Sequence, residues 1–248
     1  MEKLSDQFLA ACRKDQGRIL RGEAMTRIDT FVDAAFAFAF TMLVISIDQI
    51  PRSPSELIEL SKDIPSFVFS SLTIGSIWIA HSKWSKIFGL QDGVTVLLSL
   101  CLVVLTLIFV YPIKLMNQIT VEYFSENLGW GFLLRGLFQS EGWSQGLVSV
   151  IFVYLGIGLI LLSIILIAFY QNALRFSEEL SITLDEVRYC DHLSLVWGIV
   201  AVTAFSSLVL ASLLPPEKIQ FAGYIYFSLF LTTLLVPHLY FKYKASQA

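Results

Sequence analysis

The stretch RIDTFVDAAFAFAFTMLVISI, residues 27–47, contains a long apolar run that opens with charged residues. No charged residue follows Asp33 within it, as expected of a helix that crosses a membrane. Arg27, Asp29 and Asp33 nevertheless lie in its first turns. A charged side chain at mid-membrane depth costs about 2.5–3.5 kcal/mol on insertion scales, so such acids usually face protein or water and have partners. The sequence therefore predicts a polar partner for Asp33.

Composition indicates that the whole chain lies in a membrane. Of its 248 residues, 56% are hydrophobic and 15% are charged, whereas soluble domains have about 25% charged residues. Apolar runs long enough to span a bilayer are predicted to be helical, because lipid offers no hydrogen-bond partners to the backbone. The sequence thus predicts an all-α, polytopic membrane protein with six transmembrane helices. We expect them at 27–47, 65–88, 93–113, 146–171, 193–214 and 222–241.

The positive charges predict the orientation. With a cytosolic N-terminus, 12 of the 17 Lys and Arg residues lie on the inner side and 5 on the outer side, which favours N- and C-termini that are both cytosolic. Residues 1–26 lack a signal-peptide core and are expected to form an uncleaved cytosolic tail, followed by a transmembrane domain at 27–241 and a second cytosolic tail at 242–248. The net charge of −3 argues against a nucleic-acid partner.

The segments between the predicted spans suggest three further features. Residues 51–63 have the apolar spacing of a short interfacial helix, and residues 114–145 are expected to form the longest outer loop. On the inner side, residues 175–191 are predicted to be a helical extension, with a capping pattern from Ser181 to Asp185.

A partner for Asp33 is predicted on the second span. Trp78 and His81 are three residues apart and share one helix face. In an antiparallel neighbour they would lie at about the depth of Asp33. Asp33 could accept a hydrogen bond from His81, from the Trp78 indole or from Arg27, which would join the two helices. The alternative is that Asp33 is a titrating proton carrier.

One face of the first span has a graded composition. Counted in steps of three and four residues from Ala34, this face carries in turn a small, an aromatic, a hydroxyl, a branched and an acidic side chain. Such a face could line an axial path, or it could be an ordinary packing seam. Phe36 and Phe40 point elsewhere and are expected to pack against neighbouring helices. The residues of the graded face are Ala34, Phe38, Thr41, Ile45 and Asp48, with Met42 beside Thr41.

Two motifs together carry a family resemblance. The pattern R-x-x-x-F-x-D at Arg27, Phe31 and Asp33, followed by AAFAFAFTMLVI, resembles the first-helix signature of the transmembrane protein 175 family. The W-x-x-H of Trp78 and His81 is similar to its second-helix motif. The resemblance implies a homotetrameric potassium channel in which first helices line the pore and apolar side chains form the constriction. The TVGYG sequence of carbonyl filters does not occur in the chain.

Position by position, the resemblance implies roles for several residues. Phe38 falls at the narrowest ring, Thr41 and Met42 at the next layer and Ile45 at the outer apolar ring, while Arg27, Phe31, Asp33, Trp78 and His81 form an interhelical polar network. Asp48 is either an outer cation attractor or a solvated loop residue. The chain departs from the family pattern at Val32, where serine is usual, and at Phe38, where an aliphatic residue is expected. Potassium-to-sodium preference is therefore left open.

Other functional classes receive less support from the sequence. A proton-coupled transporter or proton pathway would use Asp33 and His81, and a non-conducting membrane scaffold is a further alternative. No H-E-x-x-H or G-x-S-x-G motif occurs, so we expect neither an enzyme nor a metal site or cofactor. The permeant potassium ion and the lipid bilayer are the expected ligands, and a bacterial plasma (inner) membrane is the expected location.

Overall fold

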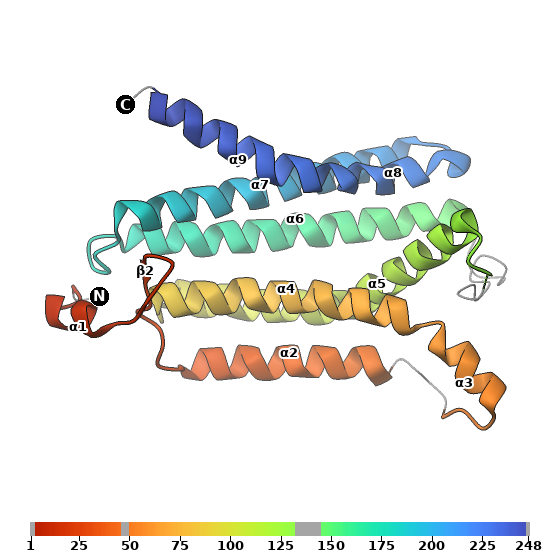
Figure 1. The fold of residues 1–248 in the computed structure, drawn as a ribbon, viewed down its shortest axis with the longest axis horizontal. Coiled ribbons are helices and arrows are strands. Elements are labelled where there is room, and N and C mark those ends of the chain that lie inside the picture. Colours follow the sequence, from red (N-terminus) through yellow and green to blue (C-terminus); the bar gives the residue numbers. More distant parts are fainter. Residues whose placement is uncertain (1–2, 46–49, 132–144, 247–248) are drawn as a thin grey trace.

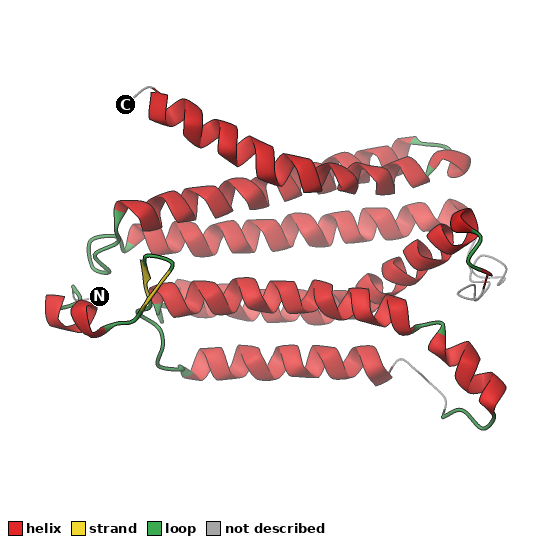
Figure 2. Ribbon diagram, viewed as in Figure 1, coloured by secondary structure: helices red, strands yellow, loops and turns green. Residues whose placement is uncertain are grey.

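The computed structural model describes residues 3–45, 50–131 and 145–246. The chain in these ranges is almost entirely helical (Figure 2). Its elements are α1 (Asp6–Ala11), β1 (Lys14–Asp15), β2 (Arg18–Ile19), α2 (Arg27–Ile45), α3 (Pro54–Ser61), α4 (Ile64–Phe88), α5 (Gly93–Leu128), α6 (Gln145–Arg175), α7 (Leu184–Leu213), η3 (Pro216–Lys218), α8 (Gln220–Tyr224), η4 (Ile225–Phe227) and α9 (Ser228–Ser246).

The long helices run roughly alongside one another (Figure 1). Helix α2 packs on α4 and α5, α5 packs on α6, and α6 makes its most extensive contact with α7, which in turn carries α8 and α9. Helices α2 and α4 are antiparallel neighbours, so the start of α2 lies level with the end of α4. The two ends of the chain lie toward the same end of this arrangement as the start of α2 (Figure 1).

Turn chemistry determines where several helices begin and end. Helix α4 stops at Gly89, whose φ of 59° is a left-handed conformation that glycine adopts without a steric penalty. Helix α5 is capped by Asp92, whose side chain accepts a hydrogen bond from the Val94 N–H. Helix α7 begins with a capping box between Thr183 and Glu186. The capping pattern expected at Ser181 to Asp185 is therefore wrong, because the backbone only becomes helical after Thr183.

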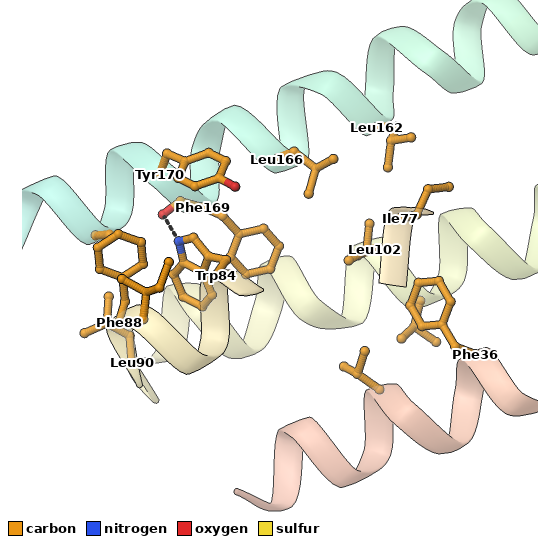
Figure 3. Packing of buried hydrophobic residues seen from close by; sticks show 14 of the residues in the cluster. Phe36, Ile77, Trp84, Phe88, Leu90, Leu102, Leu162, Leu166, Phe169 and Tyr170 are labelled. Carbon is orange, nitrogen blue, oxygen red and sulfur yellow. Dashed lines mark hydrogen bonds between the residues drawn. The ribbon is translucent and has the colours of Figure 1, made fainter. Parts of the chain in front are cut away.

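The core is built around aromatic side chains from α4 and α6 (Figure 3). Trp84 is 2% exposed, and its indole N–H donates to the Phe169 carbonyl oxygen at 3.0 Å. The two rings lie 4.6 Å apart between centroids, within the range of favourable aromatic pairs. Phe88 adds a third ring, 5.8 Å from that of Trp84. This cluster holds the C-terminal parts of α4 and α6 together.

Helix α5 is longer than the sequence predicted. It continues through Pro112 to Leu128, so the expected outer loop at 114–145 is wrong for its first part. Lys114, the first residue of that expected loop, is only 5% exposed. Farther along α5, Asn117 donates to Ser70 Oγ at 3.1 Å, which joins this half of α5 to α4. The expected short helix after the first span corresponds to α3.

Five helical segments are long and apolar enough to cross a membrane in the part of the chain that the structure describes. They are Ile64–Phe88, Gly93–Leu128, Val148–Arg175, Leu184–Leu213 and Pro216–Tyr240. The remaining expected span is α2, whose 19 residues include Arg27, Asp29 and Asp33. The architecture is that of an all-α polytopic membrane protein.

Candidate functional site

Helix α2 packs against the rest of the chain along one face. Val32, Phe36, Ala39 and Leu43 are each at most 2% exposed and belong to the main apolar cluster. Their spacing of four, three and four residues places them on the same side of the helix. Val32, where the sequence departs from the pattern it resembles, is therefore part of this buried face.

The opposite face of α2 is left uncovered. Phe31 is 49% and Phe38 55% exposed, and Ala34 and Thr41 are exposed as well. The Thr41 hydroxyl donates to the Ala37 carbonyl oxygen at 3.0 Å, so its donor is satisfied within the helix and its lone pairs remain available. This is the graded face singled out from the sequence.

Three residues predicted along the path differ from Phe38 and Thr41. Met42 is half-buried and packs against the main apolar cluster, so it lies between the two faces of α2. Ile45 is the last residue of α2, and its side chain lies outside the described part of the structure. Asp48 also lies outside the described residues.

Asp33 is bonded to α4 through one of the three predicted donors. The Trp78 indole nitrogen donates to Asp33 Oδ1 at 2.7 Å. Asp33 is half-buried and Trp78 is 37% exposed, so the bond lies at the margin of the interface between α2 and α4. A charge-assisted bond of this length fixes the rotation of α2 about its axis relative to α4.

His81 faces a different helix from Asp33. It is 3% exposed, and its Nε2 lies 3.3 Å from the Ser99 hydroxyl on α5. Its ring also meets that of Phe169 edge-on, 5.4 Å apart between centroids. His81 therefore links α4 to α5 and α6, rather than donating to Asp33.

Arg27 lies apart from the Asp33 carboxylate. Its side chain is exposed and lines a shallow pocket with Phe31 and Gln91. Within residues 3–45, 50–131 and 145–246, no hydrogen bond or ion pair joins it to Asp33.

Asp29 makes an interhelical contact that the sequence reasoning missed. Its Oδ1 accepts from the Ser85 hydroxyl of α4 at 2.6 Å, and its Oδ2 accepts from the Thr26 hydroxyl at 2.7 Å and from the Thr26 N–H at 3.1 Å. The Asp29 N–H donates back to Thr26 Oγ1 at 3.2 Å. The spacing T-x-x-D before an apolar run is the sequence signal that could have revealed this cap.

The segment before α2 is held by a buried ion pair. Arg21 Nη1 and Nη2 lie 2.9 and 2.8 Å from the two Glu186 carboxylate oxygens, and the two side chains are 1% and 0% exposed. Glu186 also accepts from the Ile19 N–H, and Arg21 Nε donates to the Leu180 carbonyl oxygen, both at 2.9 Å. The expected tail is therefore attached to the turn between α6 and α7.

Two glycines allow this segment to cross the end of α4 at close range. A Cβ on Gly22 would lie 2.2 Å from the Ser85 carbonyl oxygen and 2.7 Å from the Gly89 Cα. The Gly22 N–H donates to the Lys86 carbonyl oxygen at 2.9 Å, which satisfies one of the orphan acceptors at the end of α4. This contact fixes the position of the chain at the end of α4, shortly before α2 begins.

The fold and the half-covered first helix define a polytopic helical membrane protein. The sequence profile of the family described as endosomal/lysosomal potassium channel TMEM175 matches residues 27–112, which include α2, α4 and the first part of α5. A relative named potassium channel, from Marivirga tractuosa, is 30% identical over 167 residues, covering 67% of this chain and 66% of the relative. The match thus spans just under two thirds of that relative's length.

A solved structure shows the same fold. A variant of the potassium channel MtTMEM175, crystallised with a nanobody–MBP fusion protein, superposes with a TM-score of 0.79 at 23% identity, covering 94% of this chain and 99% of that one. The chain belongs to the transmembrane protein 175 family. Both named relatives are ion channels, a class of protein without enzymatic activity, which agrees with the expectation that the chain is not an enzyme.

Proposed function

We propose that this protein is a potassium-permeable cation channel that assembles as a homotetramer, with α2 from each copy lining a central pore. The observation that carries the proposal is that α2 packs on one face only and leaves Phe38 and Thr41 uncovered on the other. The family membership and the names of the two relatives support it.

The constriction in this proposal is apolar. Four copies of Phe38 around one axis narrow the path and hinder ions by excluding water, so opening requires the rings to move apart. Thr41 follows one turn later with available hydroxyl lone pairs. Phenyl ring faces attract cations, which makes Phe38 compatible with potassium passage.

The two polar contacts at the start of α2 orient the pore face. The bonds from Trp78 to Asp33 and from Ser85 to Asp29 join α2 to α4 at two successive levels. They hold Val32 and Phe36 toward the core and so turn Phe38 away from it. In this assignment the polar network is structural, and Asp33 is an acceptor rather than a proton carrier.

The proposed topology has six spans, with α2 as the first. Both termini lie on the cytosolic side, as the inner excess of Lys and Arg favours, and the membrane is a bacterial plasma (inner) membrane. Residues 27–241 then form the channel domain. The contacts of Arg21 mean that the preceding residues brace the inner end of this domain.

Potassium flux into liposomes tests the proposal. The purified protein is reconstituted under a potassium gradient calibrated with valinomycin, and the native chain is compared with Phe38→Ala. Removing the ring widens the constriction, so flux should rise in the variant. Phe205→Ala is the matched control, because Phe205 is 59% exposed but lies on α7.

Two results would contradict the proposal. Equal changes in flux for Phe38→Ala and Phe205→Ala would mean that α2 does not line the path. An absence of flux from both the native and Phe38→Ala proteins, with both folded and correctly oriented, would favour a scaffold.

A further inference from the structure

A groove of about 870 Å³ lies at the inner ends of α4 and α7. The β1–β2 hairpin forms its inner rim, because Glu186 accepts a hydrogen bond from the Ile19 N–H and anchors the hairpin to α7. Arg18 of the hairpin stacks over the Tyr189 ring at 4.2 Å, which places a guanidinium group at the mouth. The groove lies apart from the proposed pore face of α2.

The mouth of the groove is basic. The cations that line it are Arg13, Arg18, Lys83 and Lys86, and they outnumber the two carboxylates, Asp15 and Glu23. Glu23 is already paired with Arg13 at 3.0 Å. Both lysines are exposed, and neither takes part in an ion pair within the ranges that the structure describes. The groove therefore offers positive charge that the protein itself does not neutralise.

The floor of the groove is apolar and continues toward the membrane interior. Ile79 lies one turn before Lys83 on α4, on the same helix face, so it is deeper by about 6 Å at 1.5 Å per residue. On the α7 side, Val196 and Trp197 lie one to two turns beyond His192. Charge at headgroup depth above an apolar wall matches the two parts of a phospholipid molecule.

We propose that this groove binds an anionic phospholipid of the inner leaflet, with its phosphate beside Lys83 and Lys86 and an acyl chain along Ile79, Val196 and Trp197. Cytosolic-side basic pockets between transmembrane helices are suited to anionic headgroups. The apolar wall selects a lipid over a soluble phosphate, because a small anion would leave it uncovered. A bound lipid would join the hairpin, α4 and α7.

Trp197 offers a direct test, since it lines the groove. The full chain is reconstituted in phosphatidylcholine vesicles that also contain one brominated lipid. That lipid is either phosphatidylglycerol or phosphatidylcholine, and in both the bromine lies near the headgroup end of an acyl chain. The difference in tryptophan quenching between the native protein and Trp197→Phe isolates the Trp197 signal. Brominated phosphatidylglycerol should quench this signal more strongly than brominated phosphatidylcholine.

The lysines are tested by a charge-matched pair of variants. Lys83→Gln/Lys86→Gln should reduce the preference for phosphatidylglycerol by roughly fivefold for each lysine, as expected for a basic residue near an anionic membrane. Arg175→Gln/Arg188→Gln also removes two exposed inner-side cations, but neither lines the groove, so the preference should persist.

Three outcomes would overturn the proposal. Equal quenching of Trp197 by both brominated lipids would mean that the groove does not select charge. An equal loss of preference in the two double variants would assign the effect to general surface charge. Loss of the preference upon addition of excess soluble glycerol phosphate would identify a phosphate site that needs no lipid.

Discussion

The Trp78 indole nitrogen lies 2.7 Å from Asp33 Oδ1, so a hydrogen bond joins α4 to α2 where the apolar part of α2 begins. The acid that interrupts the apolar pattern thus has a defined acceptor role. Because its partner is an indole that cannot accept a proton, this bond offers no onward route for a proton.

Removing the Trp78 donor should loosen α2. Trp78→Phe keeps an aromatic ring but loses the bond, and we expect a loss of about 1 kcal/mol in the free energy of unfolding, as for other interhelical hydrogen bonds in membranes. Thermal unfolding in detergent measures this. Trp130→Phe is the control, since Trp130 is 51% exposed beyond the end of α5. Equal losses of unfolding free energy in both variants would mean that the bond from Trp78 has no special role in stability.

Substitution of Asp33 separates a structural from a proton-carrying role. Asp33→Asn keeps an oxygen that can accept from Trp78, whereas Asp33→Ala does not. We expect Asp33→Asn to retain potassium flux and Asp33→Ala to reduce the yield of assembled protein. Flux assays and size-exclusion chromatography measure the two effects. Proton uptake coupled to transport in the native chain, and its disappearance in Asp33→Asn, would instead support the proton pathway.

The ion pair between Arg21 and Glu186 should be the most sensitive contact of the N-terminal segment. Either Arg21→Gln or Glu186→Gln leaves a buried charge without its partner, and we expect a loss of about 3–5 kcal/mol. Thermal unfolding of each variant measures the loss. Arg13→Gln breaks the exposed pair with Glu23 and should cost less than about 1 kcal/mol. A comparable cost for all three variants would contradict this ranking.

A side chain at Gly22 should disrupt the crossing over α4. Gly22→Ala places a methyl group 2.2 Å from the Ser85 carbonyl oxygen, so the backbone must shift and the entry to α2 moves with it. We expect a lower melting temperature and a lower yield of folded protein. Gly198→Ala should be neutral or stabilising, because nothing lies within 4 Å of its added methyl and alanine is the better helix former. Similar melting temperatures for the two variants would argue against the close approach.

Asp92 should contribute a pH-dependent part of the stability. Partial burial alone would raise the pKa of its carboxyl group, but hydrogen bonds from Thr95, Asn172 and the Val94 N–H outweigh that effect and lower the pKa. A lowered pKa in the folded state gives stability that is fully present above the unfolded value of about 3.9 and is lost as the pH falls through the folded value.

The pH dependence of unfolding checks this assignment. Asp92→Asn should flatten the decline in melting temperature at acidic pH relative to the native chain. Glu178→Gln, which alters an exposed carboxylate, should leave the decline unchanged. An unchanged slope in Asp92→Asn would contradict the assignment.

The sequence alone determined the features that depend on whether each segment lies in lipid or in water, and on which face of a helix a residue falls. Long apolar runs and few charges predict membrane helices, because lipid requires the backbone to satisfy its own hydrogen bonds. The positions of Phe31 and Phe38 relative to Val32 and Phe36 likewise follow from helical periodicity. The motif residues Arg27, Asp33 and Trp78 were sufficient to indicate the family that the comparisons then showed.

Only the tertiary structure decided which polar groups meet. Asp33 had three possible donors, and the packing of α2 on α4 selected Trp78, while His81 turned to Ser99. The pairing of Arg21 with Glu186 joins residues 165 positions apart, and no local pattern specifies such a pair. Helix periodicity places a side chain on a face, but its partner depends on how two helices are rotated and offset, and that is set by the packing of the whole core.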